Sequence, residues 1–458
     1  MQRKITLALP VSFLLAACTL KVGDLGELTG DESTGDPSAT TTSDPVTTSA
    51  GTGLSGVTTM TGETGETGGS EDSGGSEDSG VTTGGYAEVE GVDILFVIDN
   101  SGSMAAHQKR LTKAIPSLVA PLSAAGLDLR VAVTTTDMGN PRCPTATYKP
   151  EGGALQARSC REAVAENEWK FGEDDFSASC FDNCAHETIT FSATTTEVDP
   201  QAAVRPWIEW SDGTGNIDVP FNEALACVLP QGIAGCGFES PLEAMHMALS
   251  RTQDPADPSF GFLRTNADLL VVIVSDETDC SYNPAAVEVF TSNKVFWNSP
   301  DDPGPTSAVC WRAGMQCTGG PGTYDDCVAA DRDLLNMVTE DPAQAVLHPV
   351  SRYQGVLSTI LAGKQQAGSK AKVHVAAIAG VPVGYPGNPL VFADGEPDIQ
   401  ANYGIGPGCE SGDAMAAPPG RIREVVEQTA PLGPGLFSIC EPSFESSLAS
   451  LADGLLDD

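Results

Sequence analysis

The sequence predicts an α/β protein with a doubly wound, mostly parallel sheet, long cysteine-rich insertions and a disordered tether before it. Apolar runs such as 92–98 and 268–275 are nearly continuous, as is typical of parallel strands buried on both faces. Segments with helical periodicity lie between such runs. Residues 19–85 are acidic, rich in Ser, Thr and Gly and nearly free of aromatic side chains, which predicts the tether.

The predicted elements alternate along the chain, as a doubly wound sheet requires. Strands are expected at 92–98, 127–134, 268–275, 372–378 and 436–439. Helices are expected at 104–125, 241–251, 349–364, 421–428 and from 444 onward. Pro116 and Pro121 should kink or divide the first of these helices. The stretches 139–222, 281–344 and 381–419 lack long periodicity and are interpreted as insertions with little core of their own.

The first 18 residues have the features of a secretory signal. Arg3 and Lys4 precede the run ITLALPVSFLLAA, which is too short to span a membrane. The segment ends in Leu-Ala-Ala-Cys, which resembles the bacterial lipobox. The resemblance implies that Cys18 carries lipid and anchors the protein at the outer membrane or cell surface, because Thr19 and not Asp follows it. An ordinary cleaved signal is the alternative.

The cysteine count agrees with a lipid-modified Cys18. Of thirteen cysteines, twelve remain for residues 19–458. An even number in an exported protein favours disulfides, and the spacings lack the two close Cys-x-x-Cys pairs of a zinc site. Six disulfides are therefore expected, with their pairing left open.

The charge excludes some partners. The chain has a formal charge of −38, and three basic and twelve acidic residues precede residue 86, which leaves −29 on residues 86–458. An acidic surface of this kind is a poor partner for nucleic acid and for anionic lipid surfaces. We therefore expect no nucleic-acid binding and a single acidic domain at 86–458.

Polar side chains follow the first predicted strand. Asp99, Ser101 and Ser103 alternate in a loop at its carboxyl end, where open α/β sheets bind ligands. Carboxylate and hydroxyl oxygens are hard ligands that suit divalent cations such as Mg²⁺, Ca²⁺ or Mn²⁺.

This loop, FVIDNSGSM, resembles the Asp-x-Ser-x-Ser motif of the von Willebrand factor A (VWA) family. The family has a Rossmann-like sheet, and its motif forms a metal-ion-dependent adhesion site. The segment VVIVSDETD places Asp276 where the family has a further metal-site Asp after its fourth strand. An Asp that only caps or turns the chain is the alternative for Asp276.

One position departs from the family pattern. In GFESPLEAMHMAL, Glu239 stands where the resemblance implies a Thr ligand. Three carboxylates would exceed the charge of a dication, so the protein should hold the cation more, and a partner's carboxylate less, than in adhesive relatives. An ordinary first-turn helix charge is the alternative for Glu239. Ala106 and His107 stand where some relatives have acids for an adjacent metal, so no second site is expected.

No catalytic residue is expected. Nucleophile elbows, phosphate loops and paired-His zinc motifs are missing from the sequence, His246 and His374 are interpreted as structural, and Asp279 as a solvated loop residue. The predicted function is a non-enzymatic surface lipoprotein that binds an extracellular or periplasmic protein or polymer through a divalent cation. The alternatives are a metal-independent scaffold of a surface complex and a metal-dependent hydrolase.

Overall fold

The computed structural model describes residues 87–143, 149–412, 414–429 and 432–457. The chain divides into a unit at 1–84 and a unit at 85–458, and the description concerns the second. The predicted signal peptide, Cys18 and the linker at 19–85 lie outside the described residues. No helix within the described ranges has both the length and the apolar character needed to cross a membrane.

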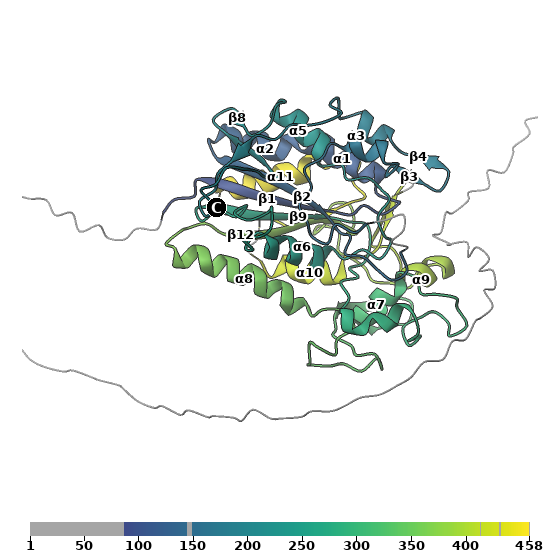
Figure 1. Ribbon diagram of the computed structural model, residues 1–458. Helices are drawn as coiled ribbons and strands as arrows, with labels where there is room; N and C mark the ends of the chain where they lie inside the picture. The colour runs from purple at the N-terminus through teal and green to yellow at the C-terminus, as the bar shows by residue number, and fades with distance from the viewer. Residues whose placement is uncertain (1–86, 144–148, 413, 430–431, 458) are drawn as a thin grey trace, which may run out of the picture. The chain divides into compact units, whose positions relative to one another are not determined.

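A seven-stranded sheet forms the centre of this unit (Figure 1). Its strands lie in the order β15 (Leu436–Ser438), β12 (Val373–Ala379), β9 (Ala267–Val274), β1 (Gly91–Ile98), β2 (Asp128–Thr135), β7 (Ile208–Ser211) and β8 (Thr214–Gly215). The five strands from β15 to β2 are parallel, and β7 and β8 continue the sheet in antiparallel pairs. The prediction of a mostly parallel sheet with helices around it is confirmed.

Helices cover both faces of the sheet (Figure 1). One face carries α1 (Ala105–Ala114), α2 (Pro116–Ala124), α5 (Phe221–Val228) and α11 (Glu445–Asp457). The other carries α6 (Pro241–Arg251), α8 (Val350–Gln366) and α10 (Gly420–Glu427). Successive side chains of a strand point to opposite faces, so a strand between two helical layers has to be apolar throughout.

Strand β1 shows why the continuous apolar run was informative. Ile94 and Phe96 belong to the core under α1 and α2, whereas Leu95 and Val97 belong to the core under α6 and α8. Every residue of this strand is buried. Burial of each such side chain stabilises the fold by about 1.5–3 kcal/mol.

The observed elements match the predicted ones to within about two residues at most ends. The predicted helix at 104–125 is divided at Ile115, which ends α1 and precedes Pro116 at the start of α2. Ile115 keeps helical dihedral angles, so the division arises because Pro116 lacks the N–H that would continue the helical hydrogen bonds. Pro121 is accommodated inside α2.

The insertions contain more structure than the sequence predicts. The stretch 139–222 includes α3 (Cys160–Ala165), β3 (Lys170–Phe171), β4 (Asp174–Asp175), α4 (Ala178–Phe181), β5 (Ala193–Thr194) and β6 (Ala203–Val204). It also supplies β7 and β8, so it is wrong to treat it as lying wholly outside the sheet. These strands are too short to give a clear alternating pattern.

The other two insertions also form short elements. They contain the 3₁₀ helix η1 (Pro284–Phe290), α7 (Ala308–Gly314), β10 (Met315–Gly319), β11 (Tyr324–Ala329), α9 (Pro397–Tyr403), β13 (Cys409–Ser411) and β14 (Ala414–Ala416). Phe290, Phe296 and Val309 belong to a separate buried cluster of the second insertion. The expectation that the insertions have little core is therefore wrong for this one.

Six disulfides join the twelve described cysteines in pairs, as the cysteine count predicts. The pairs are Cys143–Cys236, Cys160–Cys180, Cys184–Cys227, Cys280–Cys310, Cys317–Cys327 and Cys409–Cys440. Each pair includes at least one cysteine of an insertion. Closing such loops reduces the conformational entropy of the unfolded chain, which stabilises the folded protein.

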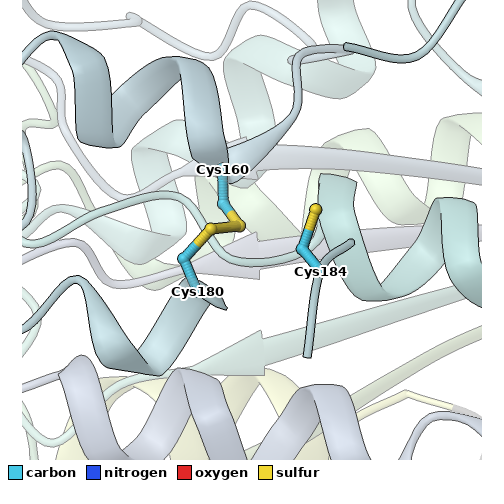
Figure 2. A group of neighbouring side chains, drawn as sticks. All are labelled: Cys160, Cys180 and Cys184. Atoms are coloured by element: carbon cyan, nitrogen blue, oxygen red, sulfur yellow. A yellow bond between two sulfur atoms is a disulfide. The ribbon is translucent and has the colours of Figure 1, made fainter. Parts of the chain in front are cut away.

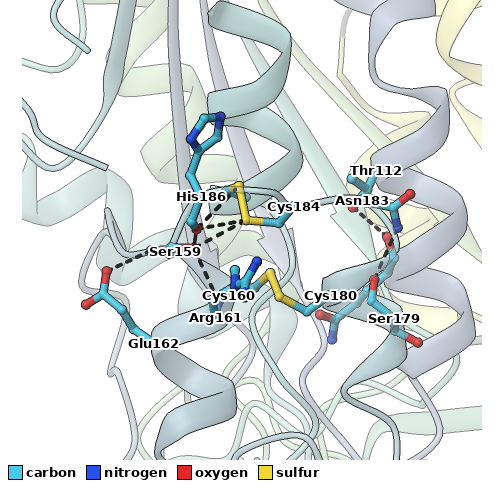
Figure 3. Close-up of a disulfide and its surroundings, with 12 residues drawn as sticks. Thr112, Ser159, Cys160, Arg161, Glu162, Ser179, Cys180, Asn183, Cys184 and His186 are labelled. Atoms are coloured by element: carbon cyan, nitrogen blue, oxygen red, sulfur yellow. Dashed lines mark hydrogen bonds between the residues drawn. A yellow bond between two sulfur atoms is a disulfide. The ribbon is translucent and has the colours of Figure 1, made fainter. Parts of the chain in front are cut away.

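Two of these disulfides lie side by side. The sulfur atoms of Cys160, Cys180 and Cys184 all lie within 4.8 Å of one another (Figure 2). Around them, the Ser159 hydroxyl caps α3 and donates a hydrogen bond of 2.7 Å to the carbonyl oxygen of His186 (Figure 3). Metal ions bind thiolates, whereas these sulfur atoms are bonded in disulfides. The cluster therefore cross-links the chain and is not a metal site.

A buried ion pair joins the carboxyl edge of the sheet to α10. Asp279 Oδ2 lies 2.8 Å from Arg421 Nε, and both side chains are fully buried. Asp279 Oδ1 accepts hydrogen bonds from the Ser281 hydroxyl and, at the start of α6, from the Leu242 N–H. The interpretation of Asp279 as a solvated loop residue is therefore wrong. The residues next to Asp279 in the sequence do not indicate that Arg421 is its partner.

Replacing Arg421 with Ala is expected to lower the free energy of unfolding by about 3–5 kcal/mol, because it leaves the Asp279 carboxylate buried without its partner. Urea denaturation measures the loss. Lys370→Ala serves as the control, since Lys370 pairs with the exposed Glu88 and should change stability by no more than about 1 kcal/mol. Equal losses in the two variants would contradict the assignment.

Candidate cation site

The candidate site lies where the connections of the sheet change direction. From β1 the chain moves to β2 on one side, whereas from β9 it moves to β12 and β15 on the other. The loops that leave β1 and β9 therefore separate at their carboxyl ends and form a crevice, which is the usual ligand position in such sheets. Asp99 follows β1 and Asp276 follows β9, so both border this crevice.

Hydrogen bonds fix the loop after β1. The fully buried Asp99 accepts hydrogen bonds at Oδ1 from the Ser101 N–H (2.8 Å) and at Oδ2 from the Ser275 hydroxyl (2.6 Å). The Oγ atoms of Ser101 and Ser103 lie 3.3 Å apart. Gln108 of α1 donates a hydrogen bond of 3.0 Å to the Asp99 carbonyl oxygen. The loop thus holds one carboxylate and two hydroxyls close together.

Glu239 enters the site from the loop before α6. It is buried and precedes Ser240, the N-cap residue of the helix. Its Oε2 accepts a hydrogen bond from the hydroxyl of Thr136, which follows β2. Its backbone carbonyl oxygen accepts one of 2.7 Å from the Cys280 N–H. The acid in the first turn of α6 is Glu243, so the alternative of an ordinary first-turn charge at Glu239 is wrong.

Asp276 is tied to the loop after β1 and to α1. The Ser103 side chain forms a hydrogen bond with its carboxylate. Its Oδ2 lies 3.8 Å from His107 Nε2, and His107 Nδ1 lies 2.6 Å from Arg110 Nη2. Burial lowers the pKa of His107 to about 3, so the imidazole is neutral at ordinary pH. Arg110 is thus the positive charge that acts on Asp276.

Two further acids, which the sequence reasoning missed, lie at this edge. Asp137 follows β2, and its carboxylate accepts hydrogen bonds from the N–H groups of Gly139 (2.9 Å) and Cys236 (3.2 Å). Glu277 follows Asp276, and its carboxylate oxygen Oε2 is buried. Asp137 follows its strand as Asp99 follows β1, and this equivalence was a signal that could have identified it. No comparable signal marks Glu277.

The acids raise one another's pKa values. Burial is the largest cause of the raised pKa of Asp99, and it raises the pKa of Asp276 to about 8, with a further increase from the charge of Asp99. Burial and the charges of Asp99 and Asp137 hold the pKa of Glu239 well above its usual range. Burial, Asp276 and Asp99 do the same for Glu277. Arg110 is the positive charge that opposes these shifts, and it acts on Asp276.

Carboxylate and hydroxyl oxygens are donor types that suit a hard divalent cation. Glu239 Oε1, Asp276 Oδ1 and Glu277 Oε2 are buried and accept no hydrogen bond from the described residues. The carboxylates do not converge on one point, because within the described ranges only Cys160, Cys180 and Cys184 meet the 4.8 Å spacing for three ligands. The hydroxyls of Ser101 and Ser103 would therefore have to complete an oxygen ligand set.

Neighbouring loops close over the Asp99–Ser103 segment. A Cβ atom at Gly102 would lie 2.5 Å from the Phe171 ring of β3, and one at Gly235 would lie 2.3 Å from Asn100 Oδ1. The Gly235 N–H also donates a hydrogen bond of 2.8 Å to the Asn100 carbonyl oxygen. Glycine is needed at both positions. Of the five predicted ligands, only Ser103 is exposed.

The chain matches no family model, and a comparison with curated proteins finds no match.

The stability of the cation-free protein is expected to fall between about pH 6.5 and 8. The folded Asp276 carboxyl has a pKa of about 8, against 3.8 for the ordinary group, so the unfolded chain binds fewer protons in this window. His107 is neutral in the folded protein there, and its ordinary pKa of 6.5 in the unfolded chain means that its opposing contribution fades as the pH rises across the window. Thermal unfolding in EDTA across the window measures the effect, with Asp276→Asn as the matched control that should flatten the profile. Stability that rises equally with pH in both proteins would contradict the raised pKa.

Proposed function

We propose that the chain is a lipid-anchored surface protein whose head is a VWA-type binding domain with a divalent cation at the carboxyl edge of its sheet. Asp99, Ser101, Ser103, Glu239 and Asp276 are its proposed ligands, and Glu277 joins them as a further candidate. The partner is an extracellular or periplasmic protein or polymer. The protein is proposed to act by binding and not by catalysis.

The arrangement of the sheet supports the VWA-type assignment. Counting only the six longer strands, the order from the antiparallel β7 to β15 is 3-2-1-4-5-6, as in Rossmann-like sheets. The loops carrying Asp99 and Asp276 flank the point where that order reverses. Both features agree with the family pattern that the sequence motif resembles.

The observation that carries the cation proposal is the set of buried carboxylate oxygens without hydrogen-bond partners. A buried charge without compensation costs several kcal/mol, and the usual responses are protonation, an ion pair or a metal ion. The charges that raise the pKa of Glu239 come from other acids, and Arg110 acts on Asp276 alone among the proposed carboxylate ligands. A divalent cation would supply the missing positive charge.

The enclosure of the site supports a cation held mainly by the chain itself. Asp99, Ser101, Glu239 and Asp276 are at most 4% exposed, so a partner's carboxylate would have to approach from the side of Ser103. The cation's main role in this proposal is to bring together loops that would otherwise repel one another. The partner then binds the surface that these loops form.

Titration of the full chain with Ca²⁺, Mg²⁺ and Mn²⁺ should show saturable binding of at least one ion, because the buried acids lack a compensating charge. Asp99→Asn should weaken the affinity by about tenfold or more, which corresponds to about 1.4 kcal/mol or more, since it removes one negative charge from the ligand set. Isothermal titration calorimetry measures both values. Glu340→Gln, which removes an exposed acid of an insertion, is the matched control. An absence of binding by every ion would remove the cation from the proposal.

Glu239→Thr should weaken cation binding and reduce the preference for Ca²⁺ over Mg²⁺. The change removes a carboxylate ligand, and Ca²⁺ accepts more ligands than Mg²⁺ and does not demand octahedral geometry. Competition titrations give the ratio of the two affinities. Unchanged affinity for both ions would mean that Glu239 serves only as the hydrogen-bond acceptor of Thr136.

A metal-independent scaffold is the second candidate, and the disulfide-linked insertions favour it. They contain eight of the twelve described cysteines, at least one from every disulfide, and one separate core, so they can keep their shape without an ion. Partner binding that persists in a chelator would support this candidate.

A further inference from the structure

A pocket of about 360 Å³ lies between the second insertion and α9. Its lining includes residues of α7, β10 and β11 on one side and Gln400 of α9 on the other, and α7 and α9 lie side by side (Figure 1). It shares no residue with the candidate cation site. The volume falls at the lower end of the range of about 300–1,000 Å³ that is typical of ligand pockets, so it suits a small ligand.

The accessible part of the lining is mainly polar. The polar side chains that are partly or largely exposed are Arg312, Tyr324, Arg332, Asn336 and Gln400. The apolar residues Phe296, Trp311 and Met315 lie beneath them and are at most 5% exposed. Val295 is the one exposed apolar side chain of the lining. A ligand in this pocket therefore meets polar groups.

The pocket reverses the charge of the unit locally. The unit has a formal charge of −29, yet among the described residues that line the pocket two are arginines and none is acidic. Most arginines of the unit pair with carboxylates. Within the described ranges, neither Arg312 nor Arg332 has a carboxylate oxygen within the 4.0 Å of an ion pair. Such a pocket attracts an anion.

Neutral oxygens of other lining residues hold the two guanidinium groups. Arg312 Nη1 donates a hydrogen bond of 3.2 Å to the Phe296 carbonyl oxygen, and Arg332 Nη1 donates to Asn336 O (3.3 Å) and Oδ1 (3.1 Å). Burial lowers the pKa of the Arg312 guanidinium, and the charge of Asp302 opposes this effect without an ion pair. The Nη2 groups of both arginines donate no hydrogen bond to the described residues, so they remain available to a ligand.

Asn336 supplies a third donor. Its Oδ1 accepts the hydrogen bond from Arg332, and its Nδ2 donates none within the described part of the chain. The other two polar side chains of the accessible lining already donate to the protein, because the Tyr324 hydroxyl donates to Asp394 Oδ1 (2.6 Å) and the Gln400 amide donates to a backbone carbonyl oxygen. The groups left for a ligand are therefore donors, and two of them carry positive charge.

We infer that this pocket binds a small tetrahedral oxyanion, phosphate or sulfate, either as the free ion or as an ester of a polar ligand such as a sugar. One guanidinium fork uses both oxygens of a planar carboxylate. A tetrahedral oxyanion presents further oxygens, which Arg312, Arg332 and Asn336 can share. The inference does not depend on a cation at the carboxyl edge of the sheet.

The donors are supported by two disulfides. Cys310, two residues before Arg312, is bonded to Cys280. The Cys317–Cys327 disulfide joins β10 to β11, and β11 carries Tyr324 of the lining. A preformed set of donors loses little conformational entropy when a ligand binds, which favours recognition of an ion as small as phosphate.

Isothermal titration calorimetry of the full chain with inorganic phosphate and sulfate tests the inference, with the protein freed of divalent cations in Tris-chloride buffer of constant ionic strength. Saturable binding at one site is expected, and acetate should bind at least about tenfold more weakly, because it has a single charge and two oxygens. Arg312→Gln and Arg332→Gln should each weaken phosphate binding by about tenfold or more. Arg332→Lys should weaken it less, since it keeps the charge and loses the fork.

Three further variants separate the pocket from general charge effects and from the cation site. Asn336→Asp should abolish phosphate binding, because it places a carboxylate beside Arg332 at an exposed position. Arg161→Gln makes the same charge change as Arg332→Gln at a residue paired with the exposed Glu187, and should leave phosphate binding unchanged. Asp99→Asn should also leave it unchanged, so failure of the cation proposal would not affect this result. Circular dichroism confirms that each variant is folded.

The outcomes that would overturn the inference are equally specific. They are an absence of saturable binding by both phosphate and sulfate, acetate binding as tight as that of phosphate, and a loss in Arg161→Gln equal to that in Arg332→Gln. Glucose 6-phosphate distinguishes the two sources of the oxyanion. Tighter binding of this ester than of inorganic phosphate supports a polar organic ligand, whereas tighter binding of the inorganic ion supports the free ion, and the oxyanion site stands in both cases.

Discussion

The burial of several carboxyl groups at the carboxyl edge of one sheet is the constraint around which the head is organised. Parallel strands bring their carboxyl ends together, so the acids that follow β1, β2 and β9 meet in space although the chain separates them widely. Donors from Ser101, Ser275 and Thr136 satisfy part of this set. The remainder keeps raised pKa values, and the edge therefore stores electrostatic repulsion that protons or a cation must relieve.

Disulfides oppose this repulsion from outside the sheet. Cys143–Cys236 links the loop after β2 to the loop before α6, three residues ahead of Glu239. Cys280–Cys310 fixes the chain three residues beyond Glu277. Like charges drive loops apart, and the Cys143–Cys236 link between the loops of Asp137 and Glu239 opposes their separation in the absence of any ion. The insertions thus support the carboxyl edge as well as extending the surface of the head.

The sequence predicted the parts that depend on local pattern. The apolar runs identified the five parallel strands, and Asp99 and Asp276 were found because each follows such a run. The sequence could not reveal features that depend on distant parts of the chain. Asp279 pairs with Arg421, which is more than 140 residues away, and the burial of Glu277 Oε2 depends on the conformation of its loop. The short β7 was missed because four residues carry too little alternation to be distinguished from a loop.

The two ends of the sheet bear on how copies of this protein would behave when crowded on a surface. β8 has two residues and β15 has three, so each border of the sheet exposes only a few unpaired backbone groups. Long, flat border strands allow neighbouring molecules to join edge to edge into fibres. Short borders of this kind, together with the mutual repulsion of units that each carry a formal charge of −29, would oppose such edge-to-edge joining wherever copies are crowded.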